Sequence, residues 1–189
     1  HTPQIWCSDN TDAVDRLRIQ YGTSFCYPPS AMGAHVSAVP NAQTGRSVSM
    51  EARGVVAMSG TFGYEMDLGR TTQEEKEIIK QQVAFFKEHY DLIQQGDYYR
   101  LTDPFRNGPY TAWEHVSPDR REALVSLVTG PVQAAAPFRI LRLKGLDPAL
   151  RYCVDGQGAW PGDVLMNAGW PLPLPRGDYQ PMQLYLQAI

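Results

Sequence analysis

A run of polar and acidic residues near the start of the sequence holds the best candidates for chemistry. The short apolar segment Pro3-Gln4-Ile5-Trp6-Cys7 is followed directly by Ser8-Asp9-Asn10-Thr11-Asp12. Asp9 and Asp12 lie three residues apart, so both can face one side of a turn that leads into a helix. Arg16 comes four residues after Asp12 and can pair with it across one helical turn. Asp9 is then the carboxylate without an obvious local partner.

An aspartic acid in such a position can act as a general acid. Burial beside a second carboxylate raises the pKa of a carboxyl group, so the group holds its proton longer as the pH rises. Glycoside hydrolysis needs one carboxyl group of this kind in its catalytic pair. The alternative is structural, because Asx-rich segments in front of helices most often form N-caps and turns. Spacing alone favours that structural interpretation.

Alternating strands and helices must position this segment. The predicted strands are 3–7, 32–36 and 61–66, and the predicted helices are 11–21, 46–58 and 72–95. This alternation predicts a parallel sheet, and in α/β barrels catalytic groups lie at the carboxyl ends of the strands. Three βα units cannot close a barrel or cover both faces of a sheet. We therefore expect residues 1–96 to be the last part of a larger α/β unit.

The helix predicted over 72–95 carries the strongest local signals. Thr72 and Glu75 match a capping box, in which a hydroxyl and a carboxylate satisfy free N–H groups at the helix start. The apolar residues that recur at helical spacing are Ile79, Val83, Phe86, Tyr90 and Ile93. Such spacing places them on one face of a single helix that ends near Gly96.

The pattern changes after Gly96, where short strand-like segments alternate with turns rich in glycine and proline. The predicted strands are Leu124–Thr129, Phe138–Leu143, Arg151–Val154, Val164–Asn167 and Gln183–Leu186. The predicted turns include Gly130-Pro131, Gly145 to Pro148, Gly156–Gly162 and Gly169–Gly177. This organisation predicts an antiparallel β-sandwich over residues 97–189.

Composition narrows the classes of function. The net charge of the 189 residues is only −3 and no basic run occurs, so we expect no nucleic-acid partner. No apolar run approaches the length of a membrane helix. Cys7, Cys26 and Cys153 are too widely spaced for a zinc site or a disulfide framework, and such free cysteines fit a reducing cytosol. The chain opens on His1 rather than Met, and we expect it to begin inside a folded unit.

Several runs resemble the bacterial α-galactosidases of glycoside hydrolase family 36, and the resemblance covers nearly the whole chain. In the first half the matching runs are Pro3 to Ala13, Ile19 to Ser24, Met32 to Asn41 and Gly63 to Gly69. In the second half they are Asn107 to Trp113 and Gly145 to Pro148. The pattern Ser8-Asp9-x-x-Asp12-x-x-x-Arg16 matches the acid/base motif of the family. The resemblance therefore implies that Asp9 is the catalytic acid/base.

The resemblance also implies a fold and an activity. Residues 1–96 would be the last three βα units of a (β/α)8 barrel, and residues 97–189 a C-terminal antiparallel β-sandwich domain. The implied activity is the retaining hydrolysis of terminal α-linked galactose from oligosaccharides such as melibiose and raffinose, without a metal or cofactor. The resemblance further implies a homo-oligomeric full-length enzyme in the cytoplasm.

Four further residues are candidates for contact with substrate. They are Trp6, Ser8, Asp12 and His35. An aromatic face such as that of Trp6 can stack on a sugar, although burial against neighbouring strands is the alternative. His35 ends a predicted strand and could line the mouth of the site, or it could be a hydrogen-bonded structural histidine.

The sequence departs from the family in several respects, because the first five barrel strands, the N-terminal β domain and the Cys- and Gly-rich segment after the fifth strand have no counterpart in it. The Lys-Trp-Asp run that carries the family's nucleophile is absent. We therefore expect the isolated chain to be inactive. Alternative functions are galactosyl transfer, an α-N-acetylgalactosaminidase activity, or a non-catalytic carbohydrate-binding or oligomerisation module built on residues 97–189.

Overall fold

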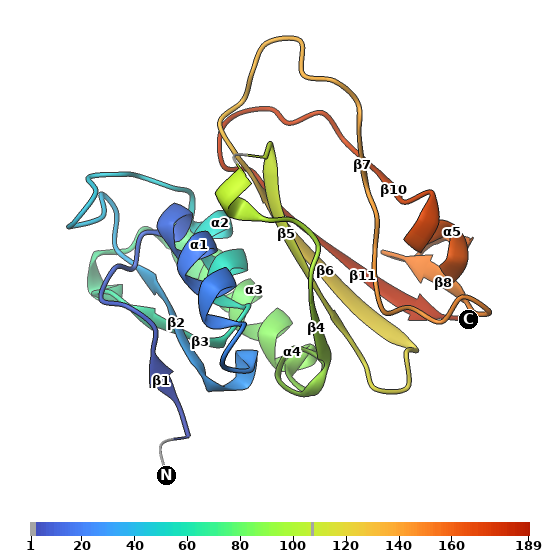
Figure 1. The fold of residues 1–189 in the computed structure, drawn as a ribbon. Helices are drawn as coiled ribbons and strands as arrows, with labels where there is room; N and C mark the ends of the chain where they lie inside the picture. The colour runs from blue at the N-terminus through green and yellow to red at the C-terminus, as the bar shows by residue number, and fades with distance from the viewer. Residues whose placement is uncertain (1–2, 107) are drawn as a thin grey trace. The chain divides into compact units, whose positions relative to one another are not determined.

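The computed structural model describes residues 3–106 and 108–189, which form two compact units, His1–Gln94 and Gln95–Ile189. The first unit runs from blue to green in Figure 1 and combines a parallel sheet with helices. The second runs from green to red and consists mainly of antiparallel strands. His1, where we expect the chain to begin inside a folded unit, and Asn107, which opens one of the matching runs, lie outside the described residues.

The sheet of the first unit is parallel, which confirms the prediction. Its strands are β1 (Ile5–Trp6), β2 (Met32–Ser37) and β3 (Thr61–Glu65), in the order β1-β2-β3. Trp6 pairs with Gly33, and His35 pairs with Gly63. The central strand β2 is largely buried, whereas the residues of β1 and β3 are half-buried or exposed. Because all three strands run parallel, their carboxyl ends lie at one edge of the sheet.

The helices of the first unit are α1 (Ala13–Thr23), α2 (Met50–Ala57), α3 (Gln73–Glu88) and α4 (Tyr90–Gln95), and its 3-10 turns are Pro29–Ala31 and Leu68–Arg70. The capping box of Thr72 and Glu75 is present at the start of α3. The single helix predicted over 72–95 is wrong at His89, where φ −102° and ψ 17° end α3. Periodicity cannot show this break, because one non-helical residue leaves the apolar spacing almost unchanged.

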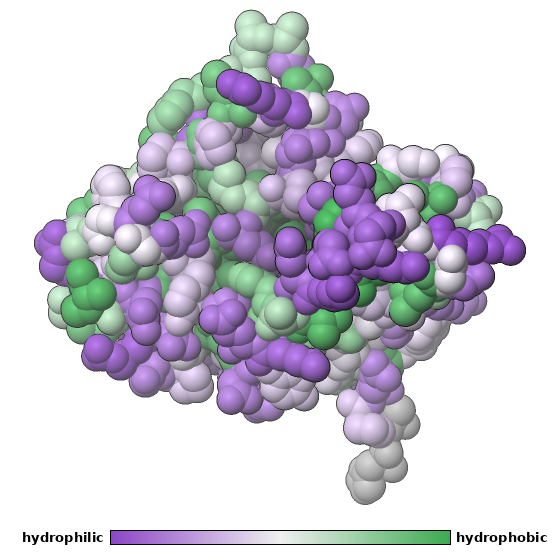
Figure 2. Space-filling model, turned by 180° about the vertical axis from the view of Figure 1, so that it is seen from behind, coloured by the Kyte–Doolittle hydropathy of each residue, from purple (hydrophilic) through white to green (hydrophobic). Residues whose placement is uncertain are grey.

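The first unit leaves apolar surface uncovered on α3. Ala34, Val36, Met50 and Ala57 form one apolar cluster of this unit, in which further apolar residues such as Met32 are buried as well. Gln82 is the buried residue of α3, whereas its apolar residues Ile78, Ile79, Val83, Phe85 and Phe86 are only half-buried. Exposed apolar atoms also interrupt the hydrophilic surface in the face that Figure 2 presents.

The second unit is built on a six-stranded antiparallel sheet in the order β4-β5-β6-β11-β8-β9. Its strands are β4 (Asp97–Arg100), β5 (Tyr110–Val116), β6 (Glu122–Thr129), β8 (Arg151–Val154), β9 (Gln157–Pro161) and β11 (Pro181–Ala188). A two-stranded antiparallel sheet pairs β7 (Arg139–Leu141) with β10 (Trp170–Leu172). The unit also contains the helix α5 (Gly162–Asn167) and the 3-10 turn Pro104–Arg106.

One continuous apolar core holds the second unit together. Leu186 and Val125 of the large sheet share it with Leu141, Leu172 and Leu165, which come from β7, β10 and α5. The two-stranded sheet and the short helix thus form the second layer. Antiparallel β organisation is confirmed, with a second layer smaller than that of an ordinary sandwich.

Some predicted elements of the second unit are wrong. Val164–Asn167, predicted as a strand, lies in α5, where the Ala168 N–H donates to the Val164 carbonyl. A run this short fits a helix or a strand equally well by pattern. The predicted turns Gly156–Gly162 and Gly169–Gly177 contain β9 and β10, and the predictions omitted β4 and β5. Their glycine and proline residues led to the prediction of turns, although short edge strands tolerate both residues.

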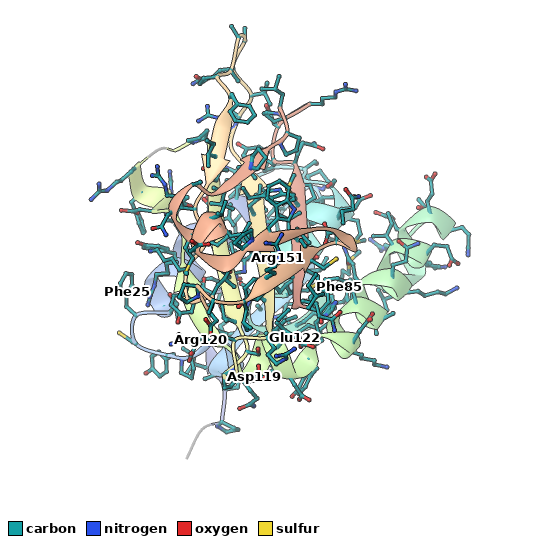
Figure 3. The ribbon with its side chains drawn as sticks, turned by 90° about the vertical axis from the view of Figure 1, so that its right-hand side faces the viewer. Phe25, Phe85, Asp119, Arg120, Glu122 and Arg151 are labelled. Carbon is teal, nitrogen blue, oxygen red and sulfur yellow. The ribbon has the colours of Figure 1, made fainter. Side chains whose placement is uncertain are left out.

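Tyr152 links this core to a tight turn. Figure 3 shows Asp119, Arg120 and Glu122 close together where β5 turns into β6. Arg120 has a φ of 57°, and the Ser117 hydroxyl donates to Asp119 at 2.7 Å. The fully buried Tyr152 donates its hydroxyl to the Arg120 carbonyl at 2.6 Å. The turn is therefore fixed from inside the core.

Glu114 is a carboxyl group on the core-facing side of β5. It lies between Ala112 and Val116 on the same face of β5, and both of these residues belong to the apolar core. The Lys144 N–H donates to Glu114 Oε2 at 2.9 Å, whereas Oε1 has no hydrogen-bond partner among the described residues. Burial raises the pKa of Glu114 to about 8, and the Lys144 N–H and charge oppose the rise only in part. Glu114 is therefore a neutral acid near pH 7.

Candidate active site

The segment Trp6 to Asp9 crosses the carboxyl edge of the parallel sheet. Trp6 ends β1, and Asp9 follows in the loop that leads into α1. His35 comes from β2, and Glu65 ends β3. The sheet thus brings together two residues predicted from the sequence, Trp6 and His35, beside the predicted acid/base.

Asp9 has a local partner that the sequence analysis missed. The Trp6 indole Nε1–H donates to Asp9 Oδ1 at 2.8 Å. The expectation that Asp9 lacks a local partner is therefore wrong, because the turn after β1 folds the indole back onto the carboxylate three residues later. Asp9 is exposed, so the described residues do not supply the burial expected for it.

Trp6 rests on His35 of the neighbouring strand. Their ring centroids lie 4.9 Å apart with an interplanar angle of 32°. A Cβ atom at Gly63 would lie 3.2 Å from His35 Cδ2, so glycine leaves room for the imidazole. Burial lowers the pKa of His35, with Glu65 opposing and Arg16 adding to the shift. These effects favour the neutral imidazole against the indole.

Asp12 is the N-cap of α1, as the structural alternative predicts. Its Oδ1 accepts the N–H groups of Val14 at 2.9 Å and Asp15 at 3.1 Å. Its Oδ2 accepts the Thr44 hydroxyl at 2.7 Å, and Arg46 forms an ion pair with Oδ1. Burial opposes ionisation of Asp12, but these hydrogen bonds and the Arg46 charge outweigh it and hold the pKa below its usual value. Contact between Asp12 and substrate stays a prediction.

Arg16 does not form the predicted contact with Asp12, and that prediction is wrong. Its buried guanidinium instead donates to the Ser8 carbonyl at 3.3 Å, to the Gly33 carbonyl and to Gln20 Oε1 at 3.0 Å. Burial lowers the pKa of Arg16, while interactions with Cys7 and Glu65 oppose the shift. Arg16 therefore ties the loop after β1 to the strand β2.

The loop after β2 contains residues that the sequence analysis missed. Asn41 Oδ1 accepts the N–H groups of Gln43 at 3.0 Å and Thr44 at 3.1 Å, which shapes the loop. Thr44 and Arg46 then reach Asp12, and Arg46 also lies 3.5 Å from Asp15. The Asn-x-x-Thr spacing signals a turn. Nothing local signals an ion pair between residues 34 positions apart.

Ser8 shapes the same loop. Its hydroxyl oxygen accepts the Asn10 N–H at 3.1 Å, and its carbonyl accepts from Arg16. These contacts are structural, and contact between Ser8 and substrate stays a prediction. Within residues 3–106 and 108–189, no group of three or more His, Cys, Asp or Glu could hold a metal ion. None of the helices in the same ranges is both long and apolar enough to cross a membrane.

The geometry suits proton transfer at Asp9. One carboxyl oxygen is fixed by an N–H donor, and the group is open to the surface at the carboxyl edge of the sheet. Asp12, three residues later, is already occupied by its cap and its ion pair. The two acidic residues of the motif thus divide into an accessible one and a structural one.

Comparison with protein families agrees with this arrangement. The Melibiase family model matches residues 1–96, and the model of the glycosyl hydrolase family 36 C-terminal domain matches residues 110–186. The α-galactosidase AgaA of Geobacillus stearothermophilus is 54% identical over 189 residues, which is 100% of this chain and 26% of that protein. The bifunctional α-galactosidase/sucrose kinase AgaSK of Mediterraneibacter gnavus is 50% identical over 184 residues, which is 97% of this chain and 20% of that protein.

Solved structures match equally well. A variant of AgaA from Geobacillus stearothermophilus in complex with raffinose superposes with a TM-score of 0.96 at 53% identity, covering 99% of this chain and 26% of that chain. The chain therefore spans only about a quarter of the length of these relatives.

Proposed function

Because this chain belongs to the Melibiase family of family 36 glycoside hydrolases, we propose that it is the C-terminal part of a retaining α-galactosidase in which Asp9 is the acid/base. Its first unit would supply the last three βα units of a (β/α)8 barrel, and its second unit would support them. The substrates would be oligosaccharides with a terminal α-linked galactose, such as raffinose.

The accessible Asp9 carboxyl beside the capped Asp12 carries this proposal. Asp9 would protonate the glycosidic oxygen as the bond to the anomeric carbon breaks, and the nucleophile would take up the galactosyl group. The Asp9 carboxylate would then accept a proton from water as the water attacks that carbon and frees galactose. In retaining enzymes the two carboxyl groups lie about 5–5.5 Å apart.

The nucleophile would come from outside residues 1–189. The uncovered surface of the first unit supports this view, because both outer strands have one free edge among the described residues and the apolar residues of α3 stay half-exposed. Exposed sheet edges and apolar helix faces are normally covered by further structure. We infer that the isolated chain does not hydrolyse α-galactosides.

The test is Asp9→Asn in the full-length enzyme that carries this chain. Turnover of raffinose should fall by about 10²–10⁴-fold, the usual contribution of general acid–base catalysis. The matched control is Asp163→Asn on the exposed surface of α5, which should leave turnover unchanged. Normal raffinose hydrolysis by a folded Asp9→Asn enzyme would rule the assignment out. Transfer of galactose to a second sugar, in place of its release, would point to a transferase.

A further inference from the structure

The contact between Trp6 and Asp9 has a chemical consequence. An indole N–H is a donor only, and a hydrogen bond from a donor stabilises the oxygen that accepts it as a charged or carbonyl-type oxygen. Asp9 Oδ1 accepts this bond at 2.8 Å. A proton on the carboxyl group therefore belongs on Oδ2. The indole thus selects which of the two oxygens exchanges a proton.

The sheet beneath the indole is shaped to hold it. Gly33, paired directly with Trp6, has no side chain, and a Cβ atom there would lie 3.0 Å from the Ile5 carbonyl oxygen and 3.5 Å from Trp6 Cε3. His35, two residues further along β2, lies on the same face and contacts the indole. Gly63 in turn makes room for His35. The imidazole of His35 therefore supports the ring from below, and the two glycines leave room for this pair.

We propose that Trp6 is a positioning residue for Asp9: its indole N–H holds Oδ1, so that Oδ2 gives the proton to the leaving group and later takes one from water, while His35 holds the indole in place. This role rests on the proposed function of Asp9. It differs from the role of a stacking wall for sugar, because it acts through the carboxyl group and not through contact with substrate.

The two roles predict different kinetics for Trp6→Phe in the full-length enzyme, since phenylalanine keeps an aromatic ring and removes the donor. A positioning role predicts that kcat for raffinose falls by about 10- to 100-fold with little change in KM, a part of the full general-acid contribution. For 2,4-dinitrophenyl α-galactoside the same variant should keep kcat/KM, which reports the first step, within about twofold of the parent, because that leaving group departs without protonation. A stacking wall predicts a raised KM for raffinose with kcat kept.

Two further variants complete the design. Trp160→Phe, in β9 of the second unit, is the matched control and should leave both substrates unaffected. His35→Ala should give a smaller loss of the same kind, whereas His35→Phe keeps a ring under the indole and should restore activity on raffinose. If Trp6→Phe fails to fold, this His35 pair tests the same positioning.

The outcomes separate the two proposals. Equal losses of kcat/KM on both substrates, or a change in KM for raffinose alone, would overturn the positioning role of Trp6, provided that Asp9→Asn still lowers raffinose turnover as predicted. An Asp9→Asn enzyme with normal turnover would overturn the proposed function itself. The positioning role is supported if the raffinose loss exceeds the dinitrophenyl loss by about tenfold or more.

Discussion

The two units of the chain differ in how far their buried polar side chains are hydrogen-bonded. In His1–Gln94 the buried Arg16 and Asp12 have hydrogen-bond partners from several elements. In Gln95–Ile189 Glu114 Oε1 and both ring nitrogens of His115 are buried without a partner among the described residues. Burial lowers the pKa of His115 to about 3 and raises that of Glu114 to about 8, so both are held neutral near pH 7.

This difference shows what each unit is built to do. In the first unit a polar network ties the loops at the carboxyl edge of the sheet to the strands. In the second unit one continuous apolar core extends over both layers, and Glu114 on the core-facing side of β5 is held neutral beside it. Rigidity at the candidate site therefore depends on hydrogen bonds, whereas the stability of the second unit depends on packing.

The largest expected effect is that of Arg16→Met. The variant removes the donor to the buried Gly33 carbonyl and to the part-buried Ser8 carbonyl, and a buried acceptor left without a partner costs about 1–3 kcal/mol. We expect a local loss of about 3–5 kcal/mol, measured as hydrogen-exchange protection of the strand Met32–Ser37. Arg18→Met, at an exposed position of α1, should change the stability measured in the same strand by less than about 0.5 kcal/mol. Unchanged hydrogen-exchange protection in Arg16→Met would contradict the view that hydrogen bonds hold the candidate site rigid.

A pH titration of the second unit comes next. The folded state keeps the Glu114 proton up to about pH 8, whereas a glutamate in the unfolded chain releases it near 4.5. At a pH between about 4.5 and 8, unfolding therefore releases the Glu114 proton. For this group the free energy of unfolding falls as the pH rises through that range. The buried neutral His115 gives a change of opposite sign over part of this window, because unfolding lets it take up a proton, so the Glu114 contribution is read as the difference between the parent and Glu114→Gln. We expect this difference in the free energy of unfolding, measured by denaturant titration, to fall by roughly 2–3 kcal/mol between about pH 5 and pH 7.

Glu114→Gln is the matched variant for that titration, because the amide keeps the size of the side chain and an acceptor for the Lys144 N–H. Its free energy of unfolding should lack the Glu114 decrease and rise over the same range, because the proton uptake of His115 on unfolding is then unopposed. If the free energies of unfolding of the parent and Glu114→Gln depend on pH in parallel, the assignment of Glu114 as a buried neutral acid is wrong.

The smallest effect concerns a local hydrogen bond in the first unit. Thr72→Ala removes the hydroxyl that accepts the Glu75 N–H at 3.1 Å. An N-cap loss of this kind costs about 1 kcal/mol. It should appear as faster hydrogen exchange in the first turn of α3, with exchange in β2 unchanged. Thr72→Ser keeps the cap and should exchange like the parent, so faster exchange in that variant would argue against a role for the cap.

Local signals predicted the elements of the chain better than its contacts. The parallel sheet and the cap of α3 follow from spacing and residue type in short windows. Val164–Asn167 was misassigned because its helix is buried through a single leucine, Leu165. The six-stranded order could not be predicted, because β11 pairs with strands that are distant in the sequence.

The same limit applies to the candidate site. The motif around Asp9 points to the carboxyl edge of the sheet, but the indole bond depends on how the turn after β1 folds. Arg46 reaches Asp12 from another loop, and Arg16 bonds to carbonyl groups that carry no sequence signal. Residue types thus identify the acidic pair and the local cap at Asp12, whereas the distant partners of Asp12 come from tertiary contacts.

The most direct test of the acid/base assignment is chemical rescue of Asp9→Ala in the full-length enzyme. With 2,4-dinitrophenyl α-galactoside the galactosyl-enzyme should form and accumulate, because its hydrolysis lacks a base. Azide needs no such base, and it should attack the anomeric carbon, restore turnover and give α-galactosyl azide with retained configuration. The absence of azide rescue in a folded variant, or a β-configured product, would contradict the assignment of Asp9 as the acid/base of a retaining enzyme.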